Sequence, residues 1–178
     1  MIVWLKYNKW IACLCLLAAS VSVTAQEKTA NIEQFRKDMY RLFNKPDSID
    51  KFMQVTDQLI EVSKQKNNEE LLYKAWANQA IMFSLVGKRQ QALDIIKVMS
   101  DYARNNDSKY GLFTSTQANA HIASGLRMED QAEELYLRCI NYKEQYLPHL
   151  NIATIYLGLA KIYYNKGEKG KLHGLTPC

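Results

Sequence analysis

The protein has 178 residues, of which 23 are basic and 18 acidic, so its formal net charge is +5. Hydrophobic residues make up 48% of the chain, which is too large a share for an intrinsically disordered protein. The low numbers of glycine (7) and proline (3) argue against a turn-rich β-sandwich, and four cysteines do not make a disulfide-dense scaffold. The length suits one or two compact domains.

Residues 1–25 have the features of a secretory signal peptide. The first nine residues contain two lysines and no acid, and an apolar run follows from Trp10 to Ala19. Short side chains at Val23 and Ala25 predict cleavage after Ala25. The apolar run has half the length of a membrane-spanning helix, which needs ~20 residues, so a cleaved signal is favoured over an anchor. We therefore expect an exported protein that begins at Gln26 and has no membrane span.

Removal of this signal leaves a net charge of +3, because it takes away two lysines and no acid. That charge is too small and too scattered to indicate a nucleic-acid partner. Cys13 and Cys15 lie within the signal, and the residues before them fit a lipidation site poorly. Cys139 and Cys178 could pair in an exported chain. Cys139 falls on the apolar face of a predicted helix, however, so a buried thiol is the favoured interpretation.

Apolar residues recur at intervals of three and four from Ile32 onward, which predicts helices along the rest of the chain. No segment alternates apolar and polar residues over the length of a strand. Pro148 is expected in the first turn of the last helix, where its missing N–H costs nothing. The predicted helices cover residues 32–43, 49–63 and 69–86, then a fourth between turns at 87–89 and 105–108, and finally 109–125, 130–146 and 148–165.

Short turns make consecutive helices antiparallel, so we predict an all-α fold of stacked helical hairpins. Three hairpins share a ring or threonine, an alanine, a second ring and a glycine at relative positions 0, 4, 7 and 11. The glycines are 38 and 42 residues apart, and two extra turn residues displace the alanine of the second unit to Ala132. A simple helical bundle can show one such match, but three favour a repeat. The matched residues are Trp76, Ala80, Phe83, Gly87 and Ala92, then Thr114, Ala118, His121, Gly125 and Ala132, then Tyr156, Ala160, Tyr163 and Gly167.

This pattern resembles the tetratricopeptide repeat, a helix–turn–helix unit of about 34 residues. The alanines let the helices of a unit approach closely, the rings fill the gap toward the next unit, and the glycine allows a tight helix end. The resemblance implies a short superhelix (an α-solenoid) with a concave groove that holds a protein or peptide. The predicted units are a hairpin at 26–68, repeats at 69–106 and 107–147, the first helix of a third repeat at 148–167 and an irregular tail at 168–178.

The stretch Leu72–Ala80, together with Ala92–Ile95, Asp101–Ala103 and Tyr110–Leu112, is similar to a more particular group. These segments resemble the extracytoplasmic regions of tetratricopeptide-containing sensor histidine kinases of Gram-negative bacteria. The resemblance implies a periplasmic sensory module of a two-component system. The chain has no nucleotide-binding glycine motif, so no kinase core is expected in it. The alternative is a free-standing periplasmic scaffold without signalling output.

The same resemblance implies ligand contacts on the first helix of each hairpin. Amides there can fix a peptide backbone and lysines attract a carboxylate, although an ordinary polar surface explains each residue equally well. The lysine–asparagine clamp of chaperone-binding members is not reproduced, because Ala77 and Ile81 occupy two of its positions. The candidate contacts are Lys74, Asn78 and Ile81, then Ser115 and Asn119, then Thr154, Lys161 and Tyr164.

No motif typical of catalysis, of a metal site or of a cofactor is found. His121, His149 and His173 lie on different elements, and His121 takes the position of Phe83 and Tyr163, which indicates a packed ring. A glycine-rich phosphate loop, a nucleophile elbow and an HExxH helix are all missing from the sequence. We therefore expect a non-catalytic protein that needs neither a metal nor a cofactor.

Residues 168–178 contain two glycines and a proline, so they cannot form the second helix of the last hairpin. The helix before them is then left with an apolar face and no partner, whereas repeat arrays need a polar terminal cap. We hypothesise that the chain is a truncated product or an altered reading frame of a longer protein. The uncapped helix is also a candidate surface for self-association.

If the chain is truncated, the adjacent coding sequence continues the repeats, and for a receptor it then encodes a membrane span and a kinase core. Sequencing downstream of codon 178 checks this. If no reading frame there encodes such a continuation, the free-standing scaffold is favoured. Residues 26–178 expressed alone are expected to self-associate or to unfold without cooperativity, because the last helix lacks its partner. A soluble, monomeric and cooperatively folding product would contradict the truncation.

Overall fold

A computed structural model describes residues 32–43, 45–168, 170 and 171. Over this part of the chain the fold is all-α, with helices, turns and no strand, as predicted. After a first helix at residues 32–43, the elements are η1 (Pro46–Ser48), α2 (Ile49–Gln65), α3 (Glu69–Leu85), α4 (Arg89–Asn105), α5 (Lys109–Gly125), α6 (Glu129–Tyr146) and α7 (Ala153–Asn165).

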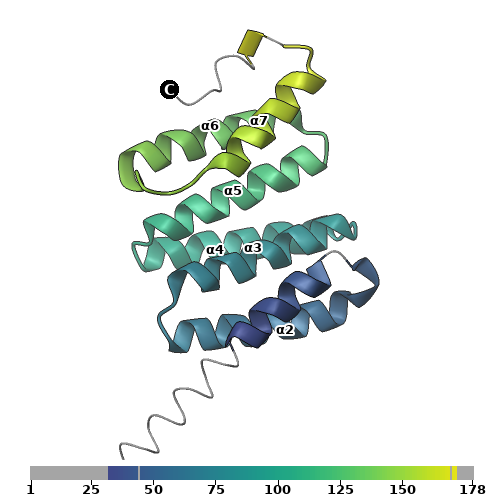
Figure 1. The fold of residues 1–178 in the computed structure, drawn as a ribbon, viewed down its shortest axis with the longest axis vertical. Coiled ribbons are helices and arrows are strands. Elements are labelled where there is room, and N and C mark those ends of the chain that lie inside the picture. Colours follow the sequence, from purple (N-terminus) through teal and green to yellow (C-terminus); the bar gives the residue numbers. More distant parts are fainter. Residues whose placement is uncertain (1–31, 44, 169, 172–178) are drawn as a thin grey trace, which may run out of the picture.

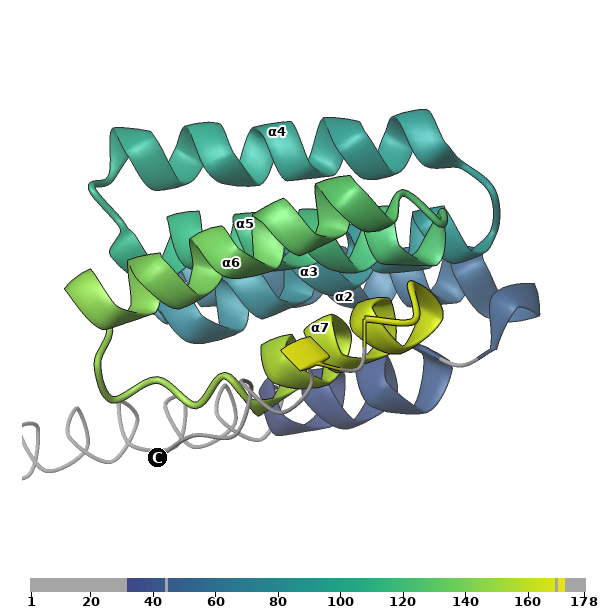
Figure 2. The ribbon, with the colours of Figure 1, turned by 90° about the horizontal axis from the view of Figure 1, so that it is seen from above.

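The helices form antiparallel hairpins that stack along the long axis of the molecule (Figure 1). Each helix packs on its neighbours in the chain, and α3 also packs along α5. Figure 2 shows helix 32–43 and α7 on one side of the stack and α4 on the opposite side. Among the described residues, no helix is both long enough and apolar enough to span a bilayer.

One turn geometry recurs through the stack. From α2 to α6 each helix begins twenty residues after the one before it. Each turn has one residue of positive φ, and the next residue donates its N–H to a carbonyl five residues back, at 2.8–3.0 Å. This is a Schellman motif, in which two carbonyls at the helix end find donors. The positive-φ residues are Asn67 (52°), Gly87 (78°), Asp107 (49°), Arg127 (60°) and Gly167 (74°).

These turns show that the repeat step is forty residues, so the predicted steps of 38 and 42 were wrong. Gly125 is the last residue of α5, and Arg127 takes the left-handed position that corresponds to Gly87 and Gly167. Glycine is the usual residue there, but Asn67 and Asp107 also adopt it in this chain. A search for glycine alone therefore misplaced the second unit by two residues.

The forty-residue step also corrects the residues that were matched in the second unit. Ala120, not Ala118, corresponds to Ala80 and Ala160, and Thr116, not Thr114, corresponds to Trp76 and Tyr156. His121 does not share a position with Phe83 and Tyr163, because the carbonyl that accepts the turn hydrogen bond in this unit is that of Ala123.

The alanines of the second helices are also in step, so the two extra turn residues predicted before Ala132 are not present. Ala132 follows Ala92 by forty residues, and both side chains are fully buried, so no extra turn residues are needed. Cys139 is also fully buried, as predicted, and burial raises the pKa of its thiol to about 12.

Two tyrosines pack against glycines of the following first helix. A Cβ atom on Gly111 would overlap the ring of Tyr73, and one on Gly158 would overlap the ring of Tyr136. Both rings are almost completely buried. These two glycines therefore serve close helix approach rather than turn formation.

The last helix departs from the twenty-residue pitch. A helix on that pitch would begin at residue 149, and the sequence predicted a start at Pro148, but α7 begins at Ala153. The Leu150 N–H donates to the Leu147 carbonyl at 2.9 Å, and the Asn151 side chain accepts from the Ala153 N–H at 2.9 Å. Residues 147–152 thus form an irregular segment in place of one helical turn.

Several predictions from the sequence concern residues outside the described part of the chain. They are the signal peptide at 1–25 with its cleavage after Ala25, the position of His173, the pairing of Cys178 and most of the irregular tail.

The forty-residue register predicts opposite effects for two glycines. Gly87→Ala should lower the free energy of unfolding by about 1 kcal/mol, because alanine is strained at positive φ. Gly125→Ala should leave it unchanged or raise it by up to ~1 kcal/mol, because this residue is helical and no atom lies near its would-be Cβ. Urea unfolding followed by circular dichroism measures both free energies. A clear loss of stability in Gly125→Ala would support the 38-residue step instead.

Candidate binding groove

A groove is lined by side chains of helix 32–43, α3, α5 and α7. Its volume is about 240 Å³. We call it the inner groove. It is lined by Tyr40 of helix 32–43, by Lys74, Ala77, Asn78 and Ile81 of α3, by Tyr110, Thr114, Gln117, Ala118 and His121 of α5, and by Thr154 of α7.

The repeat step explains why these residues share one face. Lys74, Thr114 and Thr154 are separated by forty residues each, so they occupy the same position on successive first helices. The same step relates Ala77 to Gln117. Because α3 and α5 have equal lengths and equivalent turns, side chains at equivalent positions of the two helices point in the same direction. Asn78 and Ala118, and Ile81 and His121, are related in the same way, so four equivalent positions of α3 and α5 line the groove.

Polar side chains along the groove are held by contacts between helices and within α3. Gln117 Nε2 donates to Thr154 Oγ1 at 2.9 Å, which joins α5 to α7. Asn78 Nδ2 lies 3.5 Å from the Met39 sulfur. Lys74 Nζ donates to Glu70 Oε1 at 2.5 Å, and this hydrogen bond is the main reason that the pKa of Lys74 is raised.

His121 belongs to the groove wall and also to the packed interior. Its Nδ1 lies 2.8 Å from the Tyr136 hydroxyl, and the two rings meet edge to face with centroids 5.5 Å apart. Burial lowers the pKa of His121 below its ordinary value of 6.5. The prediction of a packed ring is confirmed, although its position in the repeat is that of Ile81 and Lys161.

A larger pocket adjoins the inner groove beside the irregular segment 147–152. It has a volume of about 570 Å³ and shares Lys74, Tyr110 and Gln117 with the groove. We call it the loop pocket. Its other lining residues are Glu69, Glu70, Phe113, Leu150 and Asn151.

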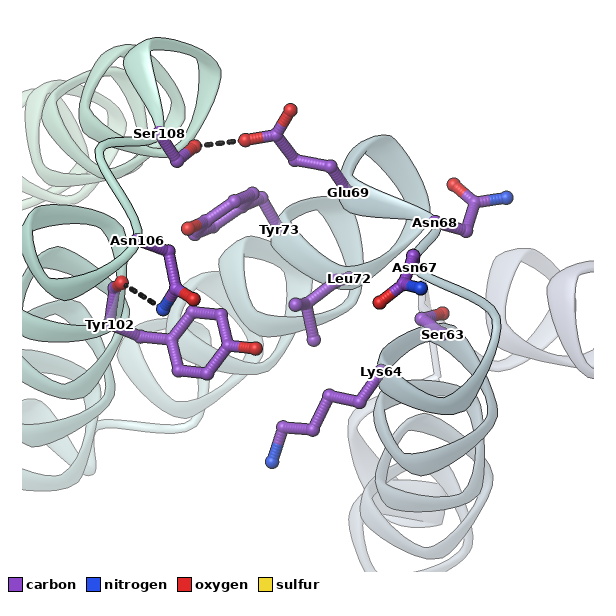
Figure 3. Close-up of a pocket in the computed structure, with 10 residues that line it drawn as sticks. All are labelled: Ser63, Lys64, Asn67, Asn68, Glu69, Leu72, Tyr73, Tyr102, Asn106 and Ser108. Atoms are coloured by element: carbon purple, nitrogen blue, oxygen red, sulfur yellow. Dashed lines mark hydrogen bonds between the residues drawn. The ribbon is translucent and has the colours of Figure 1, made fainter.

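A third cavity, of about 170 Å³, lies at the turn end of α2, α3 and α4 (Figure 3). Asn106 Nδ2 donates to the Tyr102 carbonyl at 2.8 Å there, and the Ser108 hydroxyl donates to the Glu69 carboxylate. The Tyr73 hydroxyl is buried without a hydrogen-bond partner among the described residues. It points toward α5, on the side of Gly111, rather than into the cavity.

The structure brings some of the predicted contacts together and separates others. Lys74, Asn78, Ile81 and Thr154 line the inner groove. Ser115 does not, because only 3% of it is exposed and its hydroxyl donates to the Leu112 carbonyl at 2.9 Å. Asn119, Lys161 and Tyr164 are also outside the lining, and Tyr164 is 72% exposed on α7.

The two-residue register error accounts for the misplaced contacts on α5. Ser115 and Asn119 lie 38 residues after Ala77 and Ile81, whereas the forty-residue step leads to Gln117 and His121. Gln117 was not considered from the sequence, and His121 was considered only as a packing residue. The signal that finds both is the regular twenty-residue spacing of the turn residues Asn67, Gly87, Asp107 and Arg127, only one of which is glycine.

No group of three or more histidine, cysteine, aspartate or glutamate side chains within the described ranges is arranged to hold a metal ion.

The buried His121 predicts a dependence of stability on pH. The pKa of His121 is lowered in the folded state, so the unfolded chain binds a proton more readily than the folded protein does. The contribution of His121 to the free energy of unfolding is therefore full above about pH 6.5 and is lost as the pH falls below that value. His121→Gln should cost about 1 kcal/mol near neutral pH through the lost contact with Tyr136, and less at pH ~5. Urea unfolding at both pH values measures this, with exposed His149→Gln as control. Equal losses at both pH values would contradict the prediction.

Comparison with known proteins assigns no family to this chain. It matches no protein-family model, and no curated protein or solved structure is significantly similar to it. The relation to tetratricopeptide repeats and to sensor histidine kinases therefore stays a prediction from the residues, while the stacked helical hairpins and the inner groove are features of the structure.

Proposed function

We propose that the protein is a non-catalytic binding module that holds a segment of a protein partner in the inner groove. The observation that carries this proposal is the groove itself, which crosses four helices and repeats its lining positions at a forty-residue step. A groove of this kind offers similar contacts at regular intervals, which suits an elongated ligand such as a peptide or a helix.

The lining chemistry supports a peptide ligand. Asn78 and Gln117 carry amides, which can both donate to and accept from a peptide backbone. Thr114 and Thr154 add hydroxyls, and Tyr40 and Tyr110 add aromatic rings that can pack on side chains. Only Lys74 carries a full charge within the groove wall, and it is already paired with Glu70. Hydrogen bonds and ring contacts would therefore provide most of the affinity.

We further propose that this module is a periplasmic, tetratricopeptide-like sensory region of a two-component receptor. Two sequence features support this level of detail, namely the signal-like residues 1–25 and the segments Leu72–Ala80 and Tyr110–Leu112. The exposed Leu157 and Tyr164 of α7, at 70% and 72%, leave a surface on which a further element of a longer receptor could pack. A free-standing periplasmic scaffold would use the same groove without a signalling output.

The groove proposal is tested by selecting binders from a phage-displayed peptide library. The affinity of the selected peptides is then measured by fluorescence polarisation. Asn78→Ala/Gln117→Ala should weaken binding by about tenfold or more, because two hydrogen-bonding amides are removed. The matched control is Gln90→Ala/Gln131→Ala, which removes two amides from exposed positions on α4 and α6. Equal affinities in both double variants would remove the groove assignment, and failure to select any peptide would contradict peptide binding.

A further inference from the structure

The loop pocket exists because α7 lacks its first turn. On the twenty-residue pitch a helix would begin at residue 149 and would include residues 149–152. The irregular segment takes a different path, and Leu150 and Asn151 become one edge of a cavity of about 570 Å³. This volume lies within the range of pockets that bind small ligands or single side chains. The cavity is thus a local departure from the repeat that opens onto the inner groove.

Apolar and acidic side chains both line the loop pocket. Leu150 and Tyr110 are partly exposed and provide apolar surface, whereas Phe113 is only 3% exposed. Tyr110 and Gln117 also line the inner groove, so the two spaces adjoin. Glu69 and Glu70, the first two residues of α3, add carboxylates. Apolar surface beside carboxylates suits a side chain with a long aliphatic stem and a positively charged end.

The charge of the pocket lining is negative although the chain as a whole is basic. Two carboxylates and one ammonium line the pocket, in a protein whose formal net charge is +5. Lys74 pairs with Glu70, whereas Glu69 accepts a hydrogen bond from the neutral Ser108 hydroxyl and forms no ion pair with another described residue. The Tyr110 ring beside these carboxylates offers a further favourable contact to a cation. A positive ligand group is therefore complementary to the pocket, and an acidic one is repelled.

We propose that the loop pocket receives a lysine or arginine side chain of the segment bound in the inner groove. This inference rests on the proposed function and adds a sequence preference to it. The aliphatic stem would lie on Leu150 and Tyr110, and the cationic end would reach Glu69 and Glu70. The bound cation competes with Lys74 for the Glu70 carboxylate, and this competition sets the strength of the preference.

The test uses libraries of fluorescein-labelled nonapeptides whose central residue is fixed as lysine, arginine, glutamate or leucine while the other positions are mixed. The unaltered protein should bind the lysine and arginine libraries about fivefold more tightly than the leucine library, and the glutamate library least. Glu69→Gln/Glu70→Gln should abolish this preference but keep binding of the leucine library. The charge-matched control is Glu134→Gln/Glu144→Gln at exposed positions of α6, which should retain the preference.

A second variant strengthens the preference instead of removing it. Lys74→Gln frees Glu70 from its partner, so the lysine and arginine libraries should gain a further factor of about two to five. Misfolding cannot produce such a gain. A preference that survives Glu69→Gln/Glu70→Gln, or that does not grow in Lys74→Gln, overturns the inference while leaving the groove proposal intact. No binding of any library to the unaltered protein overturns both.

Discussion

The structure depends on one repeated turn between helices of equal length, in which a single residue has positive φ. Each of these turns closes its helix with the same hydrogen bond, from the residue after the positive-φ residue to a carbonyl five positions back. Because α2, α3, α4 and α5 each have 17 residues, every second helix returns to the same orientation. Alignment of Lys74, Thr114 and Thr154 on one face is a direct consequence.

Close packing of two tyrosine rings on glycines joins neighbouring helices of the stack. Tyr73 and Tyr136 fit against Gly111 and Gly158, where any side chain would collide with the ring. The Tyr136 hydroxyl then meets His121, so a residue of the groove wall is anchored in the core. A wall that is fixed before binding loses little conformational entropy when a ligand arrives, which favours recognition by shape and by a few polar groups.

The repeat is broken at one place, and the largest of the described pockets lies there. Loss of the first turn of α7 leaves residues 147–152 in an irregular path, and Leu150 and Asn151 of this segment line a pocket beside the start of α3. Natural folds often depart from their local rules where they bind or react. This contrast leads to two proposed binding roles. The regular positions would hold a backbone, and the irregular segment would select one side chain.

Periodicity was enough to predict the all-α fold, the order of the helices and the burial of Cys139, because apolar spacing and turn residues are local signals. The resemblance to a repeat family predicted a shared face for Lys74, Asn78 and Thr154, and these three residues line one groove. The step of the repeat could not be read reliably, because Asn67, Asp107 and Arg127 adopt a conformation that glycine usually marks. Ser115 and Asn119 were misassigned for that reason. The contact of His121 with Tyr136 and the pocket beside residues 147–152 depend on how separate helices meet, and no local spacing in the chain encodes such a meeting.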